Sequence, residues 1–137
     1  MCVRISRTLT ITEEKIKQYA FLSGDFNQIH LDQKEAERYK FKEPIAHGML
    51  TMGLTLEIAS SFTEKGMRIS TYEMQFIKPI FQNDLIYIVA KKKKQDYGSI
   101  YLEITGRKQN ELVVRGELAL ERLSSIHFNN ATKESGM

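Results

Sequence analysis

Hydrophobic and polar positions divide this chain into a largely helical first part and a strand-rich second part. Alternation of polar and β-branched residues predicts a strand over residues 3–11. Thr12 then stands where a helix N-cap is expected, and the two glutamates after it complement the helix dipole, so a short helix is predicted that ends near Gly24. A second short helix is predicted over residues 32–41, where Asp32 begins the spacing of a capping box.

The most apolar stretch of the chain covers residues 49–62 and predicts a third helix. Glu57 is the only charged residue within it, so little room is left for a solvated face and burial on most sides is expected. A helix of roughly 15 residues would span about 22 Å, which is long enough to form the central axis of a small domain.

After Gly66 the pattern changes to β-branched and aromatic runs separated by turn-forming residues. Short turns between successive strands indicate antiparallel pairing, so we expect a four-stranded meander with one face to cover. The helix over residues 49–62 is the only element able to cover it. The predicted fold class is α+β: a curved antiparallel β-sheet wrapped around a central hydrophobic α-helix, the hotdog fold. The four predicted strands are residues 67–78, 85–94, 99–107 and 112–122.

Composition limits the domain count and the class of partner. A chain of 137 residues with 42% hydrophobic content suits one domain, expected over residues 1–123, followed by a polar and flexible tail over 124–137. The net charge of +3 suits an anionic ligand, such as a phosphorylated cofactor or an acidic carrier protein, and does not indicate nucleic acid. Cys2 is the only cysteine, so no internal disulfide is expected. No apolar run resembles a signal peptide or a membrane span, so we expect a cytoplasmic protein.

Three residues that carry chemistry lie within six positions: Asp25, Asn27 and His30. A carboxylate and a neutral imidazole held near one water can accept one proton and donate another, and Asn27 could orient one of them by hydrogen bonding. The alternative is a polar loop in which Asp and Asn only cap the following turn.

A second group, His47 and Gly48, stands at the expected start of the apolar helix. Unpaired N–H groups at a helix N-terminus could stabilise an oxyanion on a thioester carbonyl, and glycine would allow close approach. The alternative is a plain glycine bend. The pattern leaves open whether His47 is a site residue or a local hydrogen-bonder.

Residues 21–30 resemble the hydratase motif of the MaoC-like, (R)-specific enoyl-CoA hydratase family, which reads aromatic, aliphatic, Ser/Thr, Gly, Asp, any, Asn, Pro, aliphatic, His. Residues 44–50 match a second block of this family, and residues 76–84 resemble a third. Gln28 replaces the usual proline and Asn83 replaces a glycine, but neither change removes a chemical group.

The resemblance implies a hydro-lyase. Asp25 and His30 would activate the water that adds to a trans-2-enoyl thioester and would protonate its α-carbon; the reverse reaction dehydrates an (R)-3-hydroxyacyl thioester. The Gly48 amide would polarise the thioester carbonyl. The supporting residues would be Ser23, Asn27, His47 and Met49.

The resemblance also implies a homodimer and an acyl thioester of CoA or acyl carrier protein as the substrate. No metal or redox cofactor is expected. CoA or phosphopantetheine would be part of the substrate. Two rival functions remain on the same fold: an acyl-CoA thioesterase and a non-catalytic acyl-thioester-binding domain. The lysine run at residues 91–94 could meet phosphates or an acidic carrier protein, but a solvated edge strand is the favoured interpretation.

Overall fold

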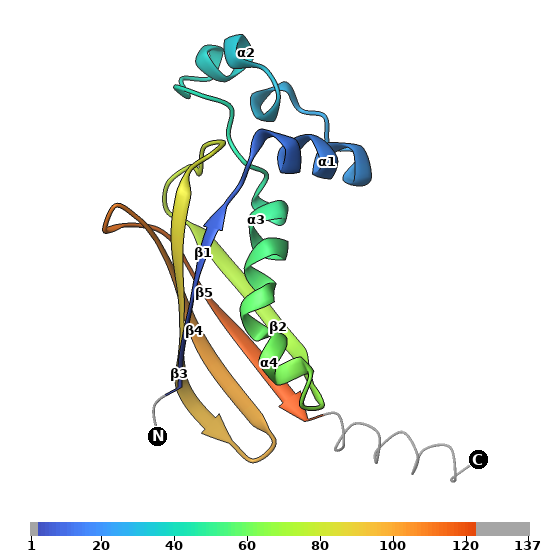
Figure 1. Ribbon diagram of the computed structural model, residues 1–137, viewed down its shortest axis with the longest axis vertical. Coiled ribbons are helices and arrows are strands. Elements are labelled where there is room, and N and C mark those ends of the chain that lie inside the picture. Colours follow the sequence, from blue (N-terminus) through green and yellow to red (C-terminus); the bar gives the residue numbers. More distant parts are fainter. Residues whose placement is uncertain (1–2, 123–137) are drawn as a thin grey trace, which may run out of the picture.

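The computed structural model describes residues 3–122, so the predicted tail over residues 124–137 and Cys2 lie outside the described part. One antiparallel sheet packs against a row of short helices, and two further helices lie at one end of the sheet (Figure 1). The elements in chain order are β1 (Arg4–Thr10), α1 (Glu13–Ser23), η1 (Gln28–His30), α2 (Gln33–Arg38), α3 (Gly48–Thr55), η2 (Leu56–Ala59), α4 (Ser60–Thr63), β2 (Met67–Phe76), β3 (Leu85–Asp96), β4 (Ser99–Lys108) and β5 (Glu111–Arg122).

The five strands are arranged in the order β1-β3-β4-β5-β2. Strands β3, β4 and β5 form the predicted meander, but β2 pairs with β5 at the edge and does not pair with β3. The predicted four-stranded meander was therefore wrong in pairing its first strand, β2, with β3. The segment between β2 and β3 crosses from one side of the sheet to the other, with Ile80 buried and its carbonyl accepting from the Ala46 amide at 2.7 Å. Long-range packing, which chain connectivity does not reveal, places this segment.

The predicted central helix is α3 followed directly by η2 and α4, so it tightens into a 3-10 turn in its middle. Leu50, Thr51 and Ile58 are buried against the sheet. One stripe at four-residue spacing is exposed, and the other positions of residues 49–62 are buried or half-buried, so the predicted burial on most sides is confirmed. This stripe consists of Met49, Gly53, Glu57 and Ser61.

The core lies between the helical row and the inner face of the sheet. Alternation along β4 buries Leu102 and Ile104 while Glu103 faces outward, as expected for a sheet covered on one side. Tyr72 of β2 donates a hydrogen bond to the Met52 carbonyl at 2.9 Å, which ties the edge strand to α3. This arrangement confirms the predicted α+β hotdog fold.

Helix α1 begins and ends as predicted: the Thr12 hydroxyl accepts from the Lys15 amide at 3.2 Å, and Gly24 takes the left-handed conformation with φ of 79°. Helix α2 is shorter than predicted, and the Asp32 side chain makes no capping hydrogen bond. Among the helices of residues 3–122, none is long and apolar enough to cross a membrane.

The lysine run does not form an edge strand throughout. Strand β3 lies between β1 and β4, with Lys91 opposite Arg4 and the Lys92 amide donating to the Val3 carbonyl. Beyond that point only β4 pairs with β3, and Lys93 and Lys94 form exposed ion pairs with acidic neighbours. The predicted solvated edge therefore holds for the second half of the run alone.

Candidate active site

The loop after α1 is shaped by three successive side chains that bond to backbone amides. The Ser23 hydroxyl accepts from the Asp25 amide at 3.1 Å, and the Asp25 carboxylate accepts from the Asn27 amide at 3.2 Å. The Asn27 side chain accepts from the Ile29 amide at 3.2 Å and so begins η1, which carries His30. The Asn27 side chain therefore positions His30 through the turn and bonds to neither catalytic side chain, while the Asn27 main-chain amide is the group that bonds to the Asp25 carboxylate.

His30 presents one ring nitrogen to Asp25. Its Nδ1 lies 2.8 Å from the Ile45 carbonyl oxygen and must donate, because a carbonyl only accepts. In the neutral ring the lone pair is therefore on Nε2, which lies 4.0 Å from the Asp25 Oδ2. The His30 side chain is mostly buried and the Asp25 side chain is half exposed. One water can contact both atoms at hydrogen-bonding distance.

A cavity of about 350 Å³ opens beside His30. Its far wall is the segment after β2, and its near wall includes Gly48 and Thr51 of α3. The Gly48 amide is the first of the helix and has no partner within it. A Cβ at Gly48 would lie 3.2 Å from the Phe76 ring, which also lines the cavity, so a larger residue here would crowd that ring. The structure thus brings a water-binding pair and a helix N-terminus to one apolar cavity.

His47 lies behind this pair. Its side chain is buried, its Nε2 donates to the Asp25 carbonyl oxygen at 3.1 Å, and its ring stacks on that of His30 with centroids 3.7 Å apart. Burial lowers the pKa of His47 from its ordinary value of 6.5. His47 does not line the cavity, and its hydrogen bond to the Asp25 carbonyl is that of a local hydrogen-bonder.

Asp25, His30 and His47 place ligand-type atoms within 4.8 Å of one another. Each histidine already donates a hydrogen bond from one ring N–H to a carbonyl, and the remaining nitrogen of His47 is buried without a hydrogen-bond partner among residues 3–122. In this arrangement the three groups do not face a single ion, so the cluster does not fit a metal site. The expectation that no cofactor is needed stays a prediction.

Among the other predicted site residues, Ser23 shapes the loop and Met49 points to solvent, with 65% of its surface exposed. Sequence reasoning missed Thr51 and Lys78, which both line the cavity. Thr51 follows His47 by one helical turn and could have been found from the helix periodicity. Lys78 belongs to the third family block, but no spacing signalled its place.

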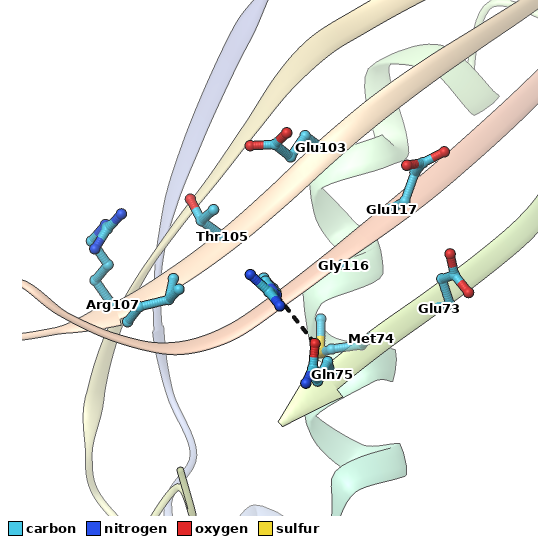
Figure 2. A pocket seen from close by; sticks show the side chains of 10 residues that line it. Glu73, Met74, Gln75, Glu103, Thr105, Arg107, Gly116 and Glu117 are labelled. Atoms are coloured by element: carbon cyan, nitrogen blue, oxygen red, sulfur yellow. Dashed lines mark hydrogen bonds between the residues drawn. The ribbon is translucent and has the colours of Figure 1, made fainter. Parts of the chain in front are cut away.

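A larger hollow of about 640 Å³ lies on the outer face of the sheet, where charged side chains of β2, β4 and β5 stand in front of the strands (Figure 2). Arg115 donates to the Gln75 side chain at 3.1 Å there. None of the predicted site residues lines this hollow. Its size therefore does not mark the active site.

The fold and the placement of these residues define a thioester hydratase-like hotdog domain. A family model described as "MaoC like domain" matches residues 2–113, and the chain belongs to this family. This match confirms the family that the sequence motifs indicated.

Three known proteins illustrate this similarity. The chain is 28% identical over 115 residues to a mitochondrial 3-hydroxyacyl-[acyl-carrier-protein] dehydratase of Arabidopsis thaliana, covering 80% of this chain and 69% of that protein. It is 36% identical over 72 residues to 3-hydroxyacyl-thioester dehydratase X of Mycobacterium tuberculosis, which covers 53% of this chain but only 25% of the relative. The solved (R)-hydratase from A. caviae, involved in PHA biosynthesis, superposes with a TM-score of 0.75 at 26% identity, over 89% of this chain and 94% of that one.

Proposed function

We propose that this protein is a hydro-lyase that adds water reversibly to trans-2-enoyl thioesters and dehydrates (R)-3-hydroxyacyl thioesters. One observation carries the proposal: the Asp25 carboxylate and the lone pair of His30 Nε2 meet 4.0 Å apart beside an apolar cavity that also contains the N-terminus of α3. Relatives named as dehydratases and an (R)-hydratase of similar fold support the same reaction class.

The chemistry follows from these atoms. Asp25 and His30 hold one water, one of them accepts its proton as the oxygen attacks the β-carbon, and the pair returns a proton to the α-carbon. The Gly48 amide stabilises the negative charge that develops on the thioester oxygen, with the positive end of the α3 dipole behind it. The apolar wall of the cavity holds the acyl chain.

The carrier of the acyl group is proposed to be anionic, as in CoA or a phosphopantetheine-bearing carrier protein. Lys78 lines the active cavity and also a neighbouring hollow of about 280 Å³. In this hollow the ammonium groups of Lys42 and Lys108 lie 5.0 and 5.7 Å from the centre of the Phe81 ring. We expect Lys42→Gln to raise the KM for crotonyl-CoA and to leave that for crotonyl-pantetheine, which lacks phosphates, unchanged.

A second copy of the chain is proposed to complete the site. Large apolar side chains around the catalytic loop are exposed, Leu22 by 85%, Phe21 by 80% and Phe26 by 51%. Such a patch next to a catalytic loop is typical of an interface. A homodimer would cover it and would also cover Met49 on the exposed stripe of α3.

The function is tested by incubating the protein with crotonyl-CoA and following the loss of enoyl absorbance. Asp25→Asn and His30→Gln should each lower kcat by about 10²-fold or more, because general acid–base groups contribute rate factors of this size. The matched control is Glu57→Gln: Glu57 is an exposed acid on η2 that pairs with Arg7 at 3.1 Å and does not line the cavity. Its activity should equal that of the wild type.

Two outcomes would contradict the proposal. Release of free CoA thiol without hydration would indicate a thioesterase, and binding of crotonyl-CoA without any turnover would indicate a non-catalytic binding domain. Thioesterases on this fold usually place an acid on the central helix. Glu57 is the only acidic residue of the α3–η2 row, and its pairing with Arg7 away from the cavity favours hydration.

A further inference from the structure

We propose that His47 is a positioning residue that holds both members of the acid–base pair at once: its Nε2–H anchors the Asp25 backbone, and its ring fixes the plane of His30. This inference rests on the proposed function. It assigns to His47 a role that requires no contact with the substrate.

Two contacts made by one buried ring carry the proposal. The Nε2 of His47 donates to the Asp25 carbonyl at 3.1 Å, which joins the catalytic loop to the residue preceding α3. The same ring is stacked on His30 with centroids 3.7 Å apart and 25° between the planes. The loop around Asp25 is otherwise exposed and held by local turns, so within residues 3–122 the bond to His47 is its only hydrogen bond to a distant part of the chain.

The neutral tautomer with the proton on Nε2 is needed for this role. The Nδ1 of His47 is buried and has no hydrogen-bond partner within the described residues, so a proton there would be unsatisfied. The titratable groups beside the stacked pair are Tyr19 of α1 and Asp25 of the loop, and Lys78 after β2 lines the same cavity as His30. The Tyr19 ring packs against the His47 ring with centroids 4.8 Å apart and 60° between the planes. The enclosure therefore favours one tautomer and one orientation.

The first experiment requires no activity. In the ¹⁵N NMR spectrum of the wild-type protein, His47 should carry its proton on Nε2 and an unprotonated Nδ1 from pH 8 down to pH 6.5. The tautomer with the proton on Nδ1 would overturn the proposal, because Nε2 could then not donate to Asp25. This result is independent of whether the protein hydrates crotonyl-CoA.

The second experiment compares two variants. His47→Leu removes the donor but keeps apolar bulk, and His47→Gln can place an amide N–H near the position of Nε2. We expect kcat with crotonyl-CoA to fall by about 10²-fold in the Leu variant, as for a small misplacement of catalytic groups, with KM nearly unchanged. The Gln variant should recover at least part of this loss.

A structural role alone would lower the thermal midpoint of both variants equally without restoring kcat in the Gln variant, and this result would overturn the proposal. A rise in KM at constant kcat would also overturn it, because His47 would then contribute to binding. If Asp25→Asn and His30→Gln retain full activity, the proposed function fails, while the tautomer measurement still decides the state of His47. If the Leu variant does not fold, the Gln variant and the NMR measurement still test the inference.

Discussion

At the scale of single residues, the site depends on side chains that bond to backbone groups and so set the position of others. Ser23, Asp25 and Asn27 each accept from an amide two residues further on, which folds the loop without a proline at Gln28. His30 and His47 each donate to a carbonyl, and this fixes which ring nitrogen carries the lone pair. Hydrogen bonds to the main chain therefore position the Asp25 carboxylate and the His30 ring.

Burial of His47 predicts a dependence of stability on pH. Its pKa is lowered in the folded chain, mainly by burial, so the unfolded chain binds a proton more readily. The contribution of neutral His47 is fully present above pH 6.5 and is lost as the pH falls below it. The free energy of unfolding in urea should therefore fall more steeply below pH 6.5 for the wild type than for His47→Gln. A difference between the two proteins that is constant from pH 5 to pH 8 would contradict this prediction.

At the scale of elements, the edge strand β2 and the helix α3 are coupled through the Tyr72 hydroxyl, which donates to Met52. Tyr72→Phe should lower the free energy of unfolding at pH 7 by about 1 kcal/mol, the typical net value of one hydrogen bond. Burial raises the pKa of Tyr72 from 10.0 to about 12, so the unfolded chain loses this proton first. The advantage of the wild type should fade as the pH rises from 10 to 12. Guanidinium unfolding titrations of both proteins at several pH values measure this difference in the free energy of unfolding.

Two glycines in different elements should respond oppositely to alanine. A Cβ at Gly116 of β5 would meet the Glu73 carbonyl oxygen of β2, and backbone of a neighbouring strand yields little, so Gly116→Ala should cost about 1–3 kcal/mol. A Cβ at Gly53 of α3 meets nothing within 4 Å, and Gly53→Ala should gain about 0.5–1 kcal/mol from helix propensity. Thermal midpoints that move in the same direction in both variants would contradict this prediction.

At the scale of the whole molecule, the helices at one end of the sheet bring the candidate catalytic loop near the start of α3 (Figure 1). The apolar side chains of Phe21, Leu22 and Phe26 are exposed around this loop. If a second copy covers them, light scattering should give about twice the 15.9 kDa of one chain. Leu22→Lys should weaken the dimer by about tenfold or more, because it removes a leucine that is exposed in the single chain and that the dimer would bury. Tyr97→Lys is the control, since Tyr97 is fully exposed in the distant β3–β4 turn and should leave the mass unchanged.

Local patterns were sufficient for the elements and for the identity of the candidate pair. The cap at Thr12, the left-handed Gly24 and the strands after Gly66 depend on neighbouring residues, and each appears close to the predicted place. The place of β2 beside β5 and the exposed stripe of α3 depend on contacts between distant segments. Sequence periodicity does not encode these contacts, which explains why the predicted meander was wrong about the pairing of β2.

The sequence by itself determined that Asp25, Asn27, His30, His47 and Gly48 belong to one family pattern, because their order and spacing match motifs of the MaoC-like family. Only the tertiary structure decided which of these side chains contact one another and which line the cavity. It places His30 next to Asp25, and it lets the Asn27 side chain bond to the Ile29 main-chain amide. His47 is buried behind this pair and does not line the cavity. The physical reason is that a side chain's role depends on its burial and its hydrogen-bond partner, and both come from residues far away in the chain.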